Sequence, residues 1–294
     1  MRAVVVTEFG GPEAVRVVDA AVPEPGARQV RIKVAAAALN PVDAGVRSGV
    51  FGGTGVLGLG WDVAGTVDAV GEGAAWQVGE EVVALVYGTA KPLGTHAEYV
   101  VVDAGAVAAA PASADAVHAA TLPLNALTAA QALDLLGLRP GQSLLVTGAA
   151  GAVGGYAVQL AAHQGFGVTG LARAGDEELV RSLGASAFVT DGVAGGFDAV
   201  LDAAVLGERA LAWVRDEGAY AGVIPHAEPA SVRGVRTAAV EVSADGGRLG
   251  ELVRLLDEGV LSTRVAEVFA LGDVVKAHVR LAEGGVRGRL VLVP

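Results

Sequence analysis

The sequence predicts an α/β protein with two domains, a small antiparallel, barrel-like domain followed by a doubly wound parallel sheet. A chain of 294 residues exceeds the size of most single compact cores. Residues 1–118 consist of short apolar and β-branched runs separated by glycine and proline, which is typical of antiparallel barrels. From Ala119 onward, strand-like and helix-like patterns alternate, as in parallel sheets that bind ligands at the carboxyl ends of their strands.

The expected elements follow the same division. In the first domain we expect strands at 3–7, 14–18, 29–38, 63–70, 81–87 and 96–102. In the second we expect strands at 143–147, 168–172, 187–190, 199–202 and 219–223, with helices at 153–164, 176–183 and 207–214. A helix at 247–258 and a strand at 264–269 precede a tail with a helical stretch at 271–282 and a strand at 289–293. We expect the tail to return to the first domain, which sets the limits at 1–118, 119–268 and 269–294.

The composition narrows the class of partner. The hydrophobic fraction of 52% comes mostly from alanine and valine, and no apolar run approaches the roughly 20 residues that span a bilayer. The net charge of −11 argues against nucleic acid, so we expect a small-molecule partner and no membrane association. Met1 leads directly into a predicted strand without a signal peptide, which places the expected protein in the cytoplasm.

The run LLVTGAAGAVGGYAVQLA at 144–161 predicts a ligand most directly. An apolar strand enters a turn in which Ala149, Gly151 and Gly154 occupy the spacing of the G-x-G-x-x-G fingerprint, with alanine in the first place. Gly151 lets the backbone approach a phosphate, and Gly154 lets helix and strand pack closely. We predict a dinucleotide held by Gly148, Ala149, Gly151, Ala152, Val153 and Gly154. Because 43 residues are glycine, a tight turn without a ligand is the alternative.

Further strings follow one another in a characteristic order along nearly the whole chain. They are ALNPVDAGVRSG (38–49), GWDVAGTVDAVGEG (60–73), VGEEVVAL (78–85), GTHAEYV (94–100), TLPLNALTAAQAL (121–133) and RGRLVLV (287–293). Together with AAGAVG at 149–154, they resemble the medium-chain dehydrogenase/reductase superfamily, in its zinc-independent NADPH:quinone oxidoreductase-like branch. The resemblance implies a GroES-like β-barrel as the catalytic domain and a Rossmann fold as the cofactor domain.

Zinc-dependent members of that superfamily hold their catalytic metal with cysteine, histidine and acidic ligands. This chain has no cysteine and only five widely spaced histidines. It has Asn40-Pro41-Val42-Asp43 where the first ligand would open a C-x-x-D string, and Gly60-Trp61-Asp62 where G-H-E would supply the next. We therefore expect no bound metal.

Arg173 bears on the choice between the two nicotinamide dinucleotides. It follows the strand expected at 168–172 and lies 22 positions beyond Gly151, where an acid would indicate NAD and an arginine the 2′-phosphate of NADP. Its guanidinium offers a fork of donors to phosphate. Asp176 stands where related enzymes often carry a lysine, and a solvated arginine at a helix start is the alternative. We predict NADPH as the cofactor.

The resemblance also assigns roles at the reacting end of the cofactor. It places Asn40 and Asp43 beside the nicotinamide and the substrate, with Asn40 positioned to hydrogen-bond an oxygen, and the Thr128 hydroxyl near the nicotinamide. The residues themselves leave other interpretations open. Asn40 before Pro41 suits a simple turn, Asp43 a helix cap, and Thr128 a position in a core helix.

Four positions at predicted strand ends complete the cofactor residues, and two aromatic residues complete the site. By resemblance, Asp202, Ala203, Gly222 and Val223 pass under the nicotinamide ribose. Trp61 and Tyr87 are predicted to line the substrate pocket, although Tyr87 also suits an ordinary aromatic residue at a strand end.

These residues predict a zinc-independent, NADPH-dependent oxidoreductase that transfers hydride to a quinone or an α,β-unsaturated carbonyl. The closest alternative is an enoyl thioester reductase of the polyketide or fatty-acid type. A non-catalytic NADPH-binding sensor is the alternative from another class. Relatives in this branch are commonly dimers, so the resemblance implies a homodimer.

Overall fold

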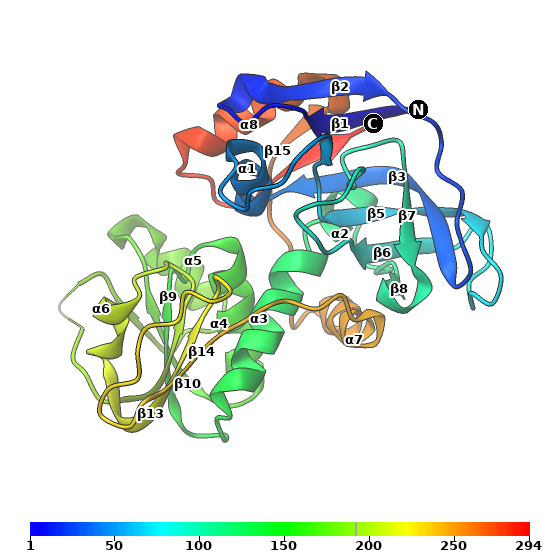
Figure 1. Cartoon of the computed structure of the whole chain (residues 1–294). Helices are drawn as coiled ribbons and strands as arrows, with labels where there is room; N and C mark the ends of the chain where they lie inside the picture. The colour runs from blue at the N-terminus through cyan, green and yellow to red at the C-terminus, as the bar shows by residue number, and fades with distance from the viewer. Residues whose placement is uncertain (192) are drawn as a thin grey trace. The chain divides into compact units, whose positions relative to one another are not determined.

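The computed structural model describes residues 1–191 and 193–294, which form two compact units (Figure 1). The first unit comprises residues 1–124, 243–258 and 263–294, and the second comprises residues 125–242 and 259–262. The predicted α/β class is confirmed, because one unit contains a largely antiparallel sheet and the other a parallel one. Among the described residues, no helix is both long and apolar enough to cross a membrane.

The first unit is built on two sheets. A three-stranded sheet has the order β2 (Val15–Asp19), β1 (Arg2–Val6), β4 (Leu57–Gly58). A seven-stranded sheet has the order β15 (Val265–Ala270), β16 (Arg289–Val293), β3 (Gln29–Leu39), β5 (Asp62–Val70), β6 (Glu81–Leu85), β8 (Val107–Ala109), with β7 (Tyr99–Asp103) paired to β3. Buried Val30, Ile32 and Val34 alternate along β3, as a strand with one face on a core requires. The C-terminal strand joins this sheet through β3, where Leu290 pairs with Leu39.

Short helices complete the first unit. They are η1 (Pro12–Ala14), α1 (Pro41–Ser48), η2 (Ala104–Ala106), α2 (Ala116–Ala119), α7 (Gly246–Asp257), η4 (Leu271–Asp273) and α8 (Val274–Glu283). One core cluster joins β1, α1, α8 and β16 through residues such as Val4, Val46, Ala277 and Leu290. The strand expected at 96–102 begins only at Tyr99, because the backbone at Ala97 turns back to hydrogen-bond the carbonyl of Thr95.

The second unit contains six parallel strands, which confirms the doubly wound prediction. Their order is β11 (Ala187–Val189), β10 (Gly167–Leu171), β9 (Ser143–Thr147), β12 (Phe197–Asp202), β13 (Val214–Gly222), β14 (Arg236–Ala239). The strand order reverses at β9, between β10 and β12. Ligands of such sheets bind at this switch point, outside the carboxyl ends of the strands.

The helices of the second unit are α3 (Pro123–Leu136, from Asn125 onward), α4 (Ala152–His163), η3 (Ala174–Asp176), α5 (Glu177–Ser182) and α6 (Glu208–Leu211). The helix expected at 207–214 is shorter than predicted and the strand expected at 219–223 starts earlier. The reason is that the Trp213 carbonyl accepts hydrogen bonds from Gly196 and Phe197, which draws the following residues into β13.

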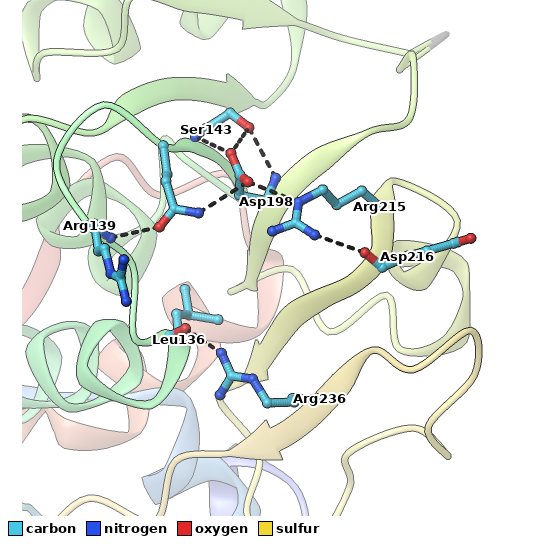
Figure 2. A network of polar contacts seen from close by, with 8 residues as sticks. Leu136, Arg139, Ser143, Asp198, Arg215, Asp216 and Arg236 are labelled. Carbon is cyan, nitrogen blue, oxygen red and sulfur yellow. Dashed lines mark hydrogen bonds and ion pairs between the residues drawn. The ribbon is translucent and has the colours of Figure 1, made fainter.

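The amino ends of the strands are closed by a polar network (Figure 2). The Asp198 carboxylate accepts hydrogen bonds from the backbone nitrogen and the hydroxyl of Ser143, both at 2.8 Å, and from Arg215 Nε at 2.9 Å. These hydrogen bonds, the backbone bond from Ser143 above all, hold the pKa of Asp198 well below its usual range. The network ties β9, β12 and β13 together at the edge opposite the glycine turn.

Candidate functional site

The predicted residues fall into two groups, one in each unit. In the second unit the glycine turn connects β9 to α4. Gly148 has φ +61°, and a Cβ built on Gly154 would lie 2.2 Å from the Gly148 carbonyl oxygen, so this crossing of helix and strand excludes any side chain at Gly154. Gly151 is the N-cap of α4 and is exposed, with no side chain capping the helix. The backbone N–H groups of the first turn of a helix have no acceptor within the helix, so the start of α4 suits an anion.

The other predicted cofactor residues of this unit lie at the same edge of the sheet. The last residues of β9, β10, β12 and β13 are in register: Thr147 pairs with Leu171 and Asp202, and Asp202 pairs with Gly222. Ala203 and Val223 directly follow two of these strands. The structure thus brings them to the edge that carries the glycine turn.

Asp202 is fully buried and hydrogen-bonded within the second unit. Its carboxylate accepts from Thr147 Oγ1 at 2.6 Å, from Tyr220 Oη at 2.9 Å, and from the backbone nitrogens of Leu206 and Gly207 at 2.7 and 2.8 Å. Burial and the Asp202 charge raise the pKa of Tyr220, so its hydroxyl stays a donor. The contacts make Asp202 the anchor of the loop 203–207, and its predicted role at the ribose stays a prediction.

Arg173 lies two residues beyond the end of β10 and is exposed. Its guanidinium makes no hydrogen bond or ion pair with another described residue. Asp176, which stands where related enzymes often carry a lysine, is only 7% exposed, and the nearby Glu177 is paired with Arg181. The guanidinium of Arg173, just after β10, is therefore available to bind a ligand.

Thr128 lies in the second unit on α3, a helix missing from the predicted elements. The helix is apolar around most of its circumference, with Ala126, Leu127, Ala129 and Ala130 all buried, so its sequence shows no amphipathic period. Thr128 is 7% exposed, and its hydroxyl has no hydrogen-bond partner within the described part of the chain. Its proximity to a nicotinamide stays a prediction.

In the first unit, Asn40 and Asp43 form the start of α1. Asn40 is the N-cap, and its backbone nitrogen donates to Asp43 Oδ2 at 2.8 Å, which is half of a capping box. Asp43 Oδ1 accepts from the Gly60 nitrogen at 2.7 Å, just before Trp61. Asp43 is buried, and both of its carboxylate oxygens accept hydrogen bonds from backbone nitrogens. Its contacts are therefore structural.

The amide of Asn40 is held on both sides. Asn40 Nδ2 donates to Asp62 Oδ2 at 2.6 Å and, more weakly, to the Ala38 carbonyl at 3.4 Å. Arg289 Nη1 donates to Asn40 Oδ1 at 3.2 Å. The side chain is 1% exposed, so in this structure it is oriented by its neighbours and both of its donor hydrogens have acceptors.

Asp62 is the buried acid at the centre of this group. Its Oδ1 accepts from the Leu124 nitrogen at 2.5 Å. Burial raises the pKa of Asp62 to about 7, while the hydrogen bonds from Leu124 and Asn40 act in the opposite direction. A carboxyl with a pKa near neutrality is typical of functional sites.

Two aromatic rings and a lysine lie beside Asp62. Trp61 is 4% exposed, and Tyr87, 46% exposed, meets it edge to face with ring centroids 5.3 Å apart. Lys91 Nζ lies 4.4 Å from the centre of the Trp61 ring and donates to the Val86 carbonyl at 2.7 Å. The structure therefore brings together Asn40, Asp43, Trp61 and Tyr87, with Asp62, Lys91 and Arg289 added.

The comparisons with known proteins cover both units. The family model described as the alcohol dehydrogenase GroES-like domain matches residues 26–112, and the one described as zinc-binding dehydrogenase matches residues 175–292. A 2-methylene-furan-3-one reductase of Solanum lycopersicum is 33% identical over an alignment that covers 100% of this chain and 79% of the relative. The chain belongs to the medium-chain dehydrogenase/reductase superfamily.

Other relatives place this superfamily member in the quinone oxidoreductase-like branch. An NADPH-dependent alkenal/one oxidoreductase of Arabidopsis thaliana is 32% identical, covering 100% of this chain and 80% of the relative. A quinone oxidoreductase of Homo sapiens is 39% identical over 60% of this chain and 54% of its own length. The solved quinone oxidoreductase of Coxiella burnetii superposes with a TM-score of 0.91 at 27% identity, covering 100% of this chain and 99% of that chain.

These findings confirm the family resemblance and the combination of a GroES-like domain with a Rossmann-like parallel sheet. They also show that this superfamily member is an oxidoreductase. One matched family model is described as zinc-binding. Within residues 1–191 and 193–294, no group of three or more histidine, cysteine, aspartate or glutamate side chains could hold a metal ion.

Three polar residues of the first group were missed by the sequence analysis. Asp62 appeared there only as part of a string, and Lys91 and Arg289 were not singled out. Asp62 directly follows Trp61, so its position carried a signal. Lys91 lies in the loop after β6 and Arg289 is the first residue of β16. Neither local sequence indicates that Arg289 contacts Asn40 or that Lys91 contacts Trp61.

Proposed function

We propose that this oxidoreductase uses NADPH to reduce a quinone or an α,β-unsaturated carbonyl. The observation that carries the proposal is the match of the whole chain to two relatives whose names describe reductases or oxidoreductases of conjugated carbonyls. One of them is named as NADPH-dependent, and a solved mycobacterial structure with a TM-score of 0.85 and 26% identity is a complex with NADPH.

The residues of the second unit fit such a cofactor. The exposed Gly151 at the N-terminus of α4 and the positive φ of Gly148 suit a pyrophosphate, because a glycine turn lets the backbone approach the phosphates at a helix N-terminus. The guanidinium of Arg173, which pairs with none of the other described residues, suits a 2′-phosphate, and the nearby Asp176 is buried. When bound, the cofactor supplies the hydride.

In the first unit, a cluster of hydrogen-bonded polar residues and two aromatic rings suits the binding of the substrate. Arg289, Asn40 and Asp62 form a hydrogen-bonded chain that fixes the Asn40 amide and the strand start at Asp62. Trp61 and Tyr87 offer flat apolar surfaces of the kind that hold a planar conjugated substrate. A rigid, largely buried shell of this kind keeps a substrate oriented without solvent reorganisation.

The proposal is tested by following NADPH oxidation with a panel of an alkenal, a cyclic enone, a quinone and a short enoyl thioester. Turnover of the enone, the alkenal or the quinone supports it. Turnover of the thioester alone would instead indicate an enoyl thioester reductase. NADPH binding without oxidation by any of the four would indicate a sensor. NADH in place of NADPH is the control for cofactor choice.

A further inference from the structure

The first unit leaves one question about the reduction open, namely which group meets the oxygen of the substrate. Asn40, the predicted donor, already gives its amide hydrogens to Asp62 and Ala38. We propose that Lys91 is a catalytic residue of this reduction: its ammonium group binds the oxygen of the conjugated carbonyl and supplies the proton that completes the reaction. This inference rests on the function proposed above.

Lys91 combines a fixed position with unused donors. Its Nζ donates one hydrogen bond, to the Val86 carbonyl at 2.7 Å, and lies 4.4 Å from the centre of the Trp61 ring. No other hydrogen bond or ion pair joins it to a described residue, so two of its three N–H donors remain available. Lys91 is partly buried as a residue, and the neighbouring Tyr87 is 46% exposed, so the two residues lie at the border between the core and the surface of the first unit.

The surroundings of Lys91 also suit proton donation. Burial lowers the pKa of Lys91 to about 8, while the charges of Asp43 and Asp62 raise it. The ammonium group is therefore still protonated at neutral pH, yet it gives up its proton more readily than an ordinary lysine. A general acid works best when its pKa lies close to the working pH.

The other polar groups of this cluster suit the role less well. His96 is 1% exposed, its Nε2 contacts the Ala38 carbonyl at 3.0 Å, and burial lowers its pKa. Asp62 is buried and accepts hydrogen bonds from Asn40 and Leu124, and Arg289 is paired with Asn40 and is too weak an acid to release a proton. Lys91 combines a positive charge, N–H donors beyond the one bonded to Val86, and a pKa from which a proton can be released.

The proposed step converts an enone to the saturated carbonyl compound. Hydride forms a new C–H bond at the β-carbon, the carbon–carbon π electrons move toward the carbonyl, and the oxygen becomes an enolate. The N–H groups of Lys91 hydrogen-bond this oxygen as its charge develops. One proton then passes from Nζ to the enolate oxygen, giving the enol, and the neutral amine takes a proton from water. The enol becomes the saturated carbonyl compound when its α-carbon gains a proton from water and its hydroxyl proton is released. With a quinone, the same proton converts the hydroquinone anion to the hydroquinone.

The test compares Lys91→Met, Lys91→Arg and the matched control Lys276→Met. Lys276 is an exposed lysine on α8, paired only with Asp273 among the described residues, and it is one of three lysines in the chain. We expect Lys91→Met to lower kcat/KM by on the order of 10²- to 10³-fold, as loss of a general acid does. We expect Lys91→Arg to keep the charge but lose proton transfer, and Lys276→Met to behave as wild type.

The pH profile separates catalysis from a structural role. Wild-type kcat/KM should fall as the pH rises through about 8, where Lys91 loses its proton, and this limb should be missing in Lys91→Arg. A second readout needs no turnover: para-nitrophenol, an analogue of the enolate, should bind wild type and Lys91→Arg as the phenolate, seen by its absorbance, and not Lys91→Met. Wild type should lose this binding above the same pH.

The outcomes distinguish the two proposals. If wild type turns over enones or quinones while both Lys91 variants keep its kcat/KM and its alkaline limb, the role of Lys91 is wrong and the proposed function stands. If wild type oxidises NADPH with none of these substrates, the proposed function fails and the role of Lys91 fails with it. If Lys91→Met does not fold, Lys91→Arg and the pH dependence of phenolate binding by wild type still decide the matter.

Discussion

At the scale of a single residue, the proposed use of NADPH depends on Arg173, an exposed guanidinium two residues beyond the end of β10. We expect Arg173→Ala to weaken NADPH binding roughly 10- to 100-fold, because a hydrogen bond between charged groups contributes about 1.5–3 kcal/mol. NADH affinity should be unchanged, since NADH lacks the 2′-phosphate. Fluorescence titration with both cofactors measures this effect.

Arg254→Ala is the matched control for Arg173, because Arg254 is an exposed arginine on α7 with a surface partner, Glu258. It should leave both affinities as in wild type. Equal NADPH affinity in Arg173→Ala and wild type would remove the argument for NADPH from this strand end.

Some residues of the candidate site could be predicted from the sequence and others could not. The positions of Gly151 and Gly154 could be predicted from the G-x-G-x-x-G spacing, because few backbone conformations form this turn. The hydrogen-bond partners of Asn40 do not follow, since Asp62 lies 22 residues away and Arg289 249 residues away in the chain. Lys91 carries no local signal, because its contact with Trp61 arises only when the loop after β6 folds back.

At the scale of elements, the crossing of α4 and β9 depends on the absence of a side chain at Gly154. We expect Gly154→Ala to destabilise the protein by about 1–3 kcal/mol or more, as overpacking does, because its Cβ would lie 2.2 Å from the Gly148 carbonyl oxygen. The strained turn should also lose NADPH affinity. Chemical unfolding and cofactor titration measure the two effects.

Gly250→Ala is the helical control for this prediction. Gly250 lies inside α7, and a Cβ there would meet no atom within 4 Å. Alanine should stabilise the protein by roughly 0.5–1 kcal/mol through helix propensity, with unchanged cofactor affinity. A Gly154→Ala protein as stable as Gly250→Ala would contradict the close packing described here.

The elements themselves were predicted unevenly, for physical reasons. Strands β9 and β16 match their predicted bounds, because each apolar run begins at a polar residue and is followed by glycine or proline. Helix α3 was missing from the predicted elements because a helix buried around most of its surface has no polar face to reveal its period. The strand predicted at 219–223 is shorter than β13, because Arg215, Asp216 and Glu217 are consecutive charged, exposed residues of a kind typical of loops.

At the scale of the whole molecule, a buried histidine makes stability depend on pH. His278 on α8 is fully buried beside Arg47, and burial lowers its pKa to about 3, with His96 and Arg47 adding to the effect. The unfolded chain therefore binds this proton first, near pH 6.5, so the contribution to stability is present above that pH and is lost as the pH falls toward 3.

We expect wild type to lose roughly 1–3 kcal/mol more than His278→Gln between pH 6.5 and 4.5. Urea unfolding followed by tryptophan fluorescence measures the difference between their slopes. His163→Gln, which changes an exposed histidine on α4, should keep the wild-type slope. Parallel slopes for wild type and His278→Gln would contradict the assignment.

The proposed reduction is tested most directly by transfer of deuterium from NADPH carrying the label at C4 of the nicotinamide. With an α,β-unsaturated ketone as substrate, we expect one deuterium at the β-carbon of the saturated product and a solvent-derived hydrogen at the α-carbon, both assigned by NMR. Oxidation of the labelled NADPH without deuterium in the product, or no oxidation with any enone or quinone, would contradict it.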